Sequence, residues 1–157
     1  MSPRPVLVRM RPDAAQPDAT GGPRGDPDEF DTWTALQKST DTTRANLIAD
    51  IVGHPKGAPS VKELSYMNPD LTEDAIRRHL YELRDVGVIA EIEIEPGNRV
   101  RGYPYKFYRL TTPAKELFDR NDLFPEDAWK RQYSRVEKTG EIRELEEMPR
   151  PDSPTHR

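Results

Sequence analysis

The sequence predicts a mainly α-helical domain that carries one small β-hairpin. Through most of the chain, apolar residues recur every three or four positions, which is the spacing that places them on one face of a helix. At residues 90–95 the period changes to two, because alanine and isoleucine there alternate with glutamate. This alternation predicts a strand with one face in water, and Pro96-Gly97-Asn98 predicts the hairpin turn after it.

Composition places this domain between two tails. The chain has 157 residues, of which 34% are hydrophobic and 33% are charged, so we expect a folded core shorter than the chain. Residues 1–28 contain six prolines and three glycines with little to bury, and residues 149–157 have the same character. We therefore expect disordered tails at 1–28 and 149–157 around a folded domain at 29–148.

Capping residues indicate where the helices begin. Ser60-Val61-Lys62-Glu63 fits a capping box, in which the serine and glutamate side chains each bind the other's backbone amide. Gly140 is expected to end the helix that starts after Pro125, so that residues 141–148 form a separate acidic helix or a frayed end. Helices are expected near residues 30–37, from Thr42 to Val52, and after Ser60, Thr72, Thr111 and Pro125.

A helix, a short helix, a turn, a helix and a two-stranded hairpin follow one another in the order of a winged helix-turn-helix. Four segments fit this order: Ser60-Val61-Lys62-Glu63-Leu64, Thr72 through Leu83, Val86-Gly87-Val88-Ile89 and Tyr108-Arg109-Leu110-Thr111. With these segments, the chain from Ser60 to Leu110 resembles archaeal transcriptional regulators of that fold, especially haloarchaeal ones grouped loosely with the ArsR, MarR and PadR families. This resemblance implies one helix in the major groove of double-stranded DNA and a wing along the DNA backbone.

The helix capped by Thr72 carries the candidate base-reading residues. Arg77 or Arg78 has the paired donors that bind guanine O6 and N7, and Tyr81 is placed to meet a phosphate or a thymine methyl group. The alternative is an ordinary solvated surface, because each arginine follows an acidic residue by four positions, which is a favoured surface pair. The DNA-binding candidates on this helix are Thr72, Arg77, Arg78 and Tyr81.

The returning strand, expected from Arg99 to Leu110, has an unusual charge pattern. Arg99 and Arg101 flank the turn, Lys106 and Arg109 follow, and no acidic residue lies between Asn98 and Leu110. Since a solvated strand face usually mixes signs, this pattern favours contact between the wing and phosphate, with Arg99 and Arg101 as the main candidates.

Two aromatic stripes flank the proposed DNA-binding segment. Trp129, Tyr133 and Val136 recur at helical spacing, and Trp33 belongs to an earlier stripe. Such a stripe is either core or a dimer seam. Because winged-helix regulators usually dimerise through helices outside the motif, we expect these four residues to form a homodimer interface.

Other chemistries lack support in the sequence. There is no cysteine, and the three histidines lie far apart, so neither a metal site nor metal sensing is expected. No glycine-rich phosphate loop and no nucleophile–base set appears, so we expect no cofactor and no enzymatic activity. No apolar run approaches the length of a membrane span, and we expect a cytoplasmic protein that does not bind membranes.

These patterns predict a sequence-specific, DNA-binding transcriptional regulator that acts as a winged-helix homodimer. The alternative is a winged-helix interaction module of the transcription or replication machinery that does not read bases. The net charge of −4 and the acidic segments fit the alternative, whereas the excess of arginine, 17 against 7 lysines, favours recognition of phosphate and guanine.

Overall fold

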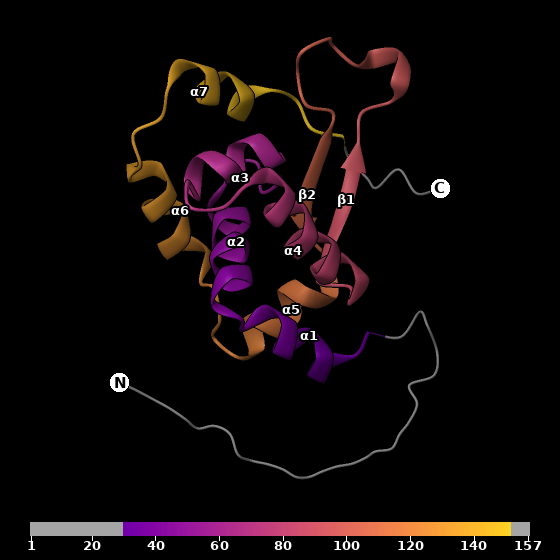
Figure 1. Ribbon diagram of the computed structural model, residues 1–157. Helices are drawn as coiled ribbons and strands as arrows, with labels where there is room; N and C mark the ends of the chain where they lie inside the picture. Colours follow the sequence, from indigo (N-terminus) through magenta and orange to yellow (C-terminus); the bar gives the residue numbers. More distant parts are fainter. Residues whose placement is uncertain (1–29, 152–157) are drawn as a thin grey trace. The chain divides into compact units, whose positions relative to one another are not determined.

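Helices and one two-stranded antiparallel sheet make up residues 30–151, the part of the chain that this computed structural model describes (Figure 1). The predicted fold class is therefore confirmed. Residues 1–28 of the expected N-terminal tail and residues 152–157 of the expected C-terminal tail lie outside the described part. In chain order the elements are α1 (Thr32–Ser39), α2 (Thr42–Gly53), α3 (Val61–Met67), α4 (Glu73–Asp85), β1 (Ile89–Glu93), a 3-10 turn (Pro96–Asn98), β2 (Lys106–Leu110), α5 (Thr112–Arg120), α6 (Glu126–Arg135) and α7 (Gly140–Glu147).

Short polar side chains start the helices at the predicted places. The Thr72 hydroxyl caps α4 by accepting a hydrogen bond from the Ala75 amide at 3.1 Å, and Thr111 caps α5 in the same way. At α3, the Ser60 hydroxyl accepts a hydrogen bond from the Glu63 amide at 3.3 Å. The Glu63 carboxylate accepts one from the Ser60 amide at 3.0 Å. The predicted capping box is therefore present, and it fixes where the first helix of the helix-turn-helix begins.

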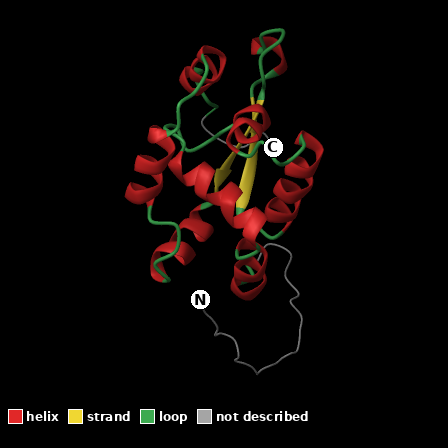
Figure 2. Cartoon of the chain, turned by 60° about the vertical axis from the view of Figure 1, so that its left-hand side comes forward, coloured by secondary structure: helices red, strands yellow, loops and turns green. Residues whose placement is uncertain are grey.

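The helix-turn-helix and the hairpin share one core. Helix α3 packs against α4, α4 packs against β1, and α2 packs against β2. The two strands, yellow in Figure 2, lie among these helices and pair from Ile89 opposite Leu110 to Glu93 opposite Lys106. The inward side chains Leu64, Ile76, Leu80, Leu83, Ile92 and Phe107 have no exposed surface.

The second strand is shorter than the sequence predicts, because it begins at Lys106 and not at Arg99. Pro104 has no amide to donate to a ladder, and Gly102 has a φ of +84°, a left-handed conformation that a strand does not contain. The last bond between the two sides of the hairpin runs from the Ile94 amide to the Tyr105 carbonyl at 2.8 Å. Residues 95–104 therefore form a long, irregular wing tip.

The helix after Pro125 ends at Arg135, so the prediction that Gly140 ends it is wrong. Gly140 instead begins α7, and the Thr139 hydroxyl caps that helix by accepting the Ile142 amide at 3.3 Å. Of the two alternatives for residues 141–148, the structure confirms the separate helix.

Gly53, the last residue of α2, allows α2 and α6 to approach closely. A Cβ atom added to Gly53 would lie 2.5 Å from the Trp129 carbonyl oxygen and 2.9 Å from the Tyr133 Cβ atom. Both distances are shorter than side chains tolerate, and one of the atoms belongs to backbone. The contact between the two helices therefore requires glycine here.

We expect Gly53→Ala to lower the free energy of unfolding by about 1–3 kcal/mol, the usual cost of overpacking a well-packed contact. Gly97→Ala is the matched control, because nothing lies within 4 Å of its added Cβ atom. The control is expected to stay within about 0.5 kcal/mol of the wild type. Urea denaturation measures both, and an equal loss in the two variants would contradict the close approach.

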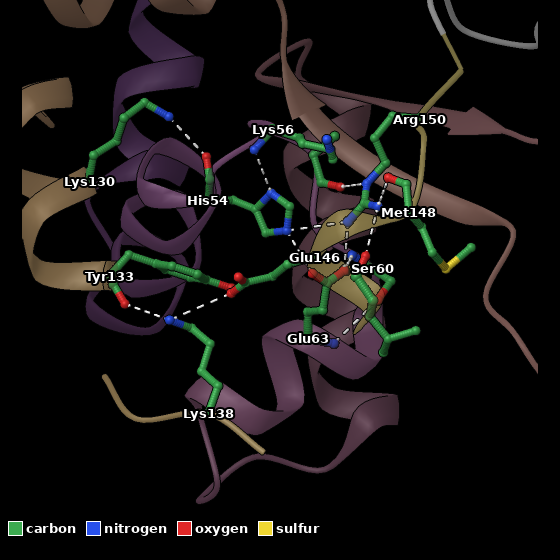
Figure 3. A network of polar contacts seen from close by, with 12 residues as sticks. His54, Lys56, Ser60, Glu63, Lys130, Tyr133, Lys138, Glu146, Met148 and Arg150 are labelled. Atoms are coloured by element: carbon green, nitrogen blue, oxygen red, sulfur yellow. Dashed lines mark hydrogen bonds and ion pairs between the residues drawn. The ribbon is translucent and has the colours of Figure 1, made fainter. Parts of the chain in front are cut away.

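A buried polar network ties the C-terminal segment to α3 (Figure 3). His54 and Glu63 are fully buried, and the His54 Nε2 atom lies 2.6 Å from a Glu63 carboxylate oxygen. The Lys56 amide donates to His54 Nδ1 at 3.1 Å, which leaves Nε2 to donate to Glu63. The Arg150 guanidinium, 6% exposed, donates to the other Glu63 oxygen at 2.9 Å.

Arg150 also binds the backbone on both sides of this network. Its remaining donors bind the carbonyl oxygens of Ala58, Leu145 and Met148 at 2.7–2.9 Å, and its guanidinium stacks over the Phe107 ring at 4.3 Å. The composition predicts that the folded domain ends at residue 148. In the structure, Arg150 anchors the chain just beyond α7 to the core.

We expect Arg150→Met to lower the free energy of unfolding by about 3 kcal/mol, because removing one partner leaves the buried Glu63 charge less compensated. Methionine keeps an apolar contact with Phe107. Arg143→Met on α7 is the control, since Arg143 is exposed and has no ion-pair partner among residues 30–151. Urea denaturation at pH 7 measures the difference.

The same difference is expected to depend on pH. Burial raises the pKa of the Glu63 carboxyl, but the hydrogen bonds from His54 and the Ser60 amide and the Arg150 charge outweigh burial, so the pKa is lowered. A carboxyl with a lowered folded-state pKa stabilises the fold above its unfolded pKa and loses that contribution as pH falls through the folded value. The difference in free energy of unfolding between wild type and Arg150→Met is therefore expected to be largest at pH 7 and to shrink below about pH 4. A gap that stays constant from pH 7 to pH 3 would contradict this role for Glu63.

Candidate nucleic-acid interface

Helix α4 presents two arginines in different states. The Arg77 guanidinium binds Glu73 at 3.3 Å and Asp74 at 3.2 Å. The sequence predicts one acid for each arginine, but in the structure both acids bind Arg77. Arg78 is exposed and has no hydrogen-bond or ion-pair partner in the described part of the chain. Of the two candidates, Arg78 therefore has its donors available.

Tyr81 lies half-buried beside the wing. The Arg84 guanidinium stacks on the Tyr81 ring at 4.6 Å and donates to Glu91 of β1 at 3.4 Å. Glu91 also accepts a hydrogen bond from the Tyr108 hydroxyl at 2.8 Å. Burial raises the pKa of Tyr108, and the hydrogen bond to Glu91 raises it further, so this phenol stays protonated as a donor. The glutamates of β1 thus bind partners and do not merely face water.

The wing carries fewer free cations than the sequence suggests. Arg99 lies 3.0 Å from Glu93 and stacks over the Tyr105 ring at 3.8 Å. Lys106 lies within 4.0 Å of both Glu91 and Glu93. Arg101, in contrast, is exposed and without an ion-pair or hydrogen-bond partner among residues 30–151.

Arg109 lies on the other face of the hairpin from Tyr108. In the ladder, Tyr108 pairs with Glu91 and Arg109 pairs with Ala90, and successive residues of a strand point to opposite faces. Tyr108 and Glu91 are on the side of Tyr81 and Arg84, which belong to α4. Arg109 therefore does not join Arg101 on the surface next to α4.

A groove of about 410 Å³ lies between the start of α3, the exposed side of α4 and the wing. Its lining combines tyrosine rings with basic side chains, which suits a nucleic-acid backbone and its sugars. Lys62, Tyr103 and Tyr105 are not among the residues that the sequence predicts for DNA binding. The lining includes Lys62, Arg77, Tyr81, Tyr103, Tyr105 and Lys106.

The wing tip contacts α7, which lies at the same end of the domain (Figure 1). The Tyr103 hydroxyl donates to a Glu144 carboxylate oxygen at 2.9 Å, and this bond raises the pKa of Tyr103. At the start of α3, Lys62 lies 3.0 Å from Glu141, also on α7. Helix α7 therefore supports both sides of the groove.

The four residues expected at a dimer seam have different environments. Trp33 on α1 is 67% exposed and Val136, just after α6, is 40% exposed. Trp129 is half-buried. Tyr133 is 3% exposed within the single chain, where its ring meets the His54 ring at 5.7 Å and Lys138 Nζ at 4.5 Å. Most of the Tyr133 surface is thus covered by its own chain.

Residues 30–151 show no features of two other kinds. No helix in this range is long and apolar enough to cross a membrane. Nor does this part of the chain bring three histidine, aspartate or glutamate side chains together in a group that could hold a metal ion.

Comparison with known proteins identifies one structural neighbour. No protein-family model matches the chain, and no curated protein matches it. Among solved structures, the chain is similar to a protein "with a GntR superfamily winged-helix-turn-helix domain" from the haloarchaeon Halomicrobium mukohataei. The TM-score is 0.69 and the identity 29%, over 86% of this chain and 95% of that one.

This neighbour confirms the winged helix-turn-helix fold, which is typical of DNA-binding regulators. It supports the resemblance to winged-helix regulators at that level. The neighbour's GntR superfamily gives no support to the specific grouping with the ArsR, MarR and PadR families.

Proposed function

We propose that this chain is an archaeal, cytoplasmic transcriptional regulator that binds specific sequences in double-stranded DNA. The observation that carries this proposal is the pair of exposed arginines, Arg78 on α4 and Arg101 on the wing, that lack partners among the described residues. They belong to the two elements that a winged helix-turn-helix uses on DNA, and the groove between these elements is lined by aromatic and basic side chains.

Each candidate has a distinct role in this proposal. Arg78 reads a guanine edge through two parallel donors, and Thr72, at the N-terminus of α4, lies where a backbone phosphate is favoured. Tyr81 contacts the backbone or a thymine methyl group. Arg77 and Arg99 are held by acids, so they reach phosphate only after exchanging those partners. Arg101 binds phosphate directly.

We further propose that the protein acts as a homodimer and that Trp33 contributes the central contact of the seam. Leaving an indole 67% exposed to water is unfavourable, and aromatic residues are enriched at interfaces. Val136 and the exposed part of Trp129 are secondary candidates. Tyr133 supports α6 from within the chain.

Substitutions at Arg78 and Arg101 are expected to separate base recognition from phosphate binding. Arg78→Ala should cost about 1–3 kcal/mol on the preferred site and relax discrimination at one base position. Arg101→Ala should weaken all duplexes alike and make the slope of log affinity against log salt shallower by about 1 per protomer. Selection from a random duplex library defines the preferred site, and salt titrations by fluorescence anisotropy measure both effects.

Arg120→Ala is the control for these substitutions. Arg120 is an exposed arginine on α5, and the described part of the chain offers it no ion-pair partner. If neither Arg78→Ala nor Arg101→Ala differs from this control on any duplex, DNA binding by α4 and the wing is disproved. A winged-helix module that docks on protein then becomes the better account.

Trp33→Glu is expected to give a folded monomer, because the indole is 67% exposed within the single chain. The affinity for a duplex with two half-sites should fall by more than tenfold, because a monomer binds one half-site and a dimer binds both at once. Sedimentation velocity measures the assembly, and Trp129→Glu provides the comparison. If the Trp33→Glu variant stays dimeric, the dimer interface does not depend on α1.

A further inference from the structure

A second concave site lies on the Arg109 side of the hairpin. Its volume is about 220 Å³, and it lies between the end of α2, the loop after it, the end of β2, α5 and the start of α6. None of its lining residues also lines the groove between α4 and the wing. Its lining includes the apolar side chains Val52, Phe118 and Phe124 and the basic side chains Lys56, Arg109 and Lys115.

Three basic side chains of this pocket lack a partner. Lys56, Arg109 and Lys115 have no side-chain hydrogen bond or ion pair to any residue from 30 to 151. The pocket's fourth cation, Lys130, is engaged, because its Nζ atom donates to the His54 carbonyl at 2.9 Å (Figure 3) and lies 3.8 Å from Glu126.

The acids of the pocket do not neutralise these cations. Two acidic residues, Asp119 and Glu126, line it, and both are exposed. With four basic and two acidic lining residues, the pocket is net positive, although the whole chain is net negative. The field inside it therefore favours an anion.

Arg109 gives the pocket its clearest chemical preference. The residue is half-buried, and its guanidinium presents five N–H donors in a planar fork. Donors removed from water without acceptors are unfavourable, whereas a carboxylate or phosphate satisfies two of them at once. Phe118 and Phe124, whose rings meet edge to face at 4.9 Å, offer an apolar surface beside it.

We propose that this pocket binds a small organic anion, namely a carboxylate or phosphate group attached to an apolar body. Arg109 binds the anionic group in bidentate fashion, Lys56 and Lys115 add charge, and the apolar side chains contact the body. The volume lies below the roughly 300–1,000 Å³ of typical ligand pockets, so the ligand is small. This proposal does not depend on the proposed DNA binding.

Calorimetric titration of the full chain tests the proposal. The probes are phenyl phosphate and benzoate, with inorganic phosphate and phenol as the matched ligands that lack the apolar body or the charge. We expect saturable binding of at least one of the two probes at one site per chain, and weaker binding of both matched ligands. Which probe binds tighter distinguishes a phosphate site from a carboxylate site.

Two variants locate the binding. Arg109→Gln and Lys115→Gln should each weaken the probe by about tenfold, the loss expected for a charge-assisted hydrogen bond. Arg120→Gln, on the same helix as Lys115 but outside the pocket, should bind like the wild type. Lys115 is exposed, so Lys115→Gln keeps the test decisive even if Arg109→Gln fails to fold.

Three outcomes would overturn the proposal. They are the absence of saturable binding, binding by Lys115→Gln as tight as that of the wild type, and inorganic phosphate binding as tight as phenyl phosphate. A loss of duplex-DNA affinity in Lys115→Gln, without any probe binding to the wild type, would assign these cations to DNA and exclude a small-ligand site.

Discussion

The buried carboxylate of Glu63 connects three separate parts of the chain, and the position of the elements that we propose face DNA depends on it. Within α3 it completes the capping box with Ser60. It also accepts a hydrogen bond from the His54 ring, just after α2, and another from Arg150, beyond α7. Because α3 packs on α4 and α7 packs on α3, the same carboxylate holds the helix that would enter DNA and the helix that supports the wing tip. A buried charge is stable only when its partners are in place, so these segments are ordered together.

On the side that we propose faces DNA, the pairing of charges would limit the non-specific affinity for DNA. Glu73 and Asp74 bind Arg77, and the glutamates of β1 bind Arg84, Arg99 and Lys106. Affinity that comes from neutralising phosphates grows with the number of available cations and falls with salt. With a net charge of −4 and few unpaired arginines, affinity for DNA would depend less on general attraction to phosphate and more on contacts at defined positions.

How far the sequence predicts this molecule depends on how local each interaction is. The capping box at Ser60, the Thr72 cap and the change to period two are set by neighbours in the chain, and the structure contains all three. The pairing of the wing cations could not be predicted, because Glu91 and Glu93 meet Lys106 only through the strand register. The contacts of Arg150 could not be predicted for the same reason. Glu63 lies on α3, Ala58 in the loop before it and Phe107 on β2, and the proline-rich composition around Arg150 gives no sign of them.

Strand β2 belongs to both proposed binding surfaces. Tyr108 and Arg109 are neighbours in sequence, yet the pleat directs one toward the groove beside α4 and the other toward the basic pocket. The strand is held from both sides, because the Tyr108 amide donates to the Pro59 carbonyl at 3.0 Å while its hydroxyl binds Glu91. An anion bound at Arg109 would neutralise one positive charge beside a strand that also borders the groove proposed to bind DNA. Linkage then sets a strict condition: any factor by which such an anion changes the affinity for DNA is the factor by which DNA changes the affinity for the anion.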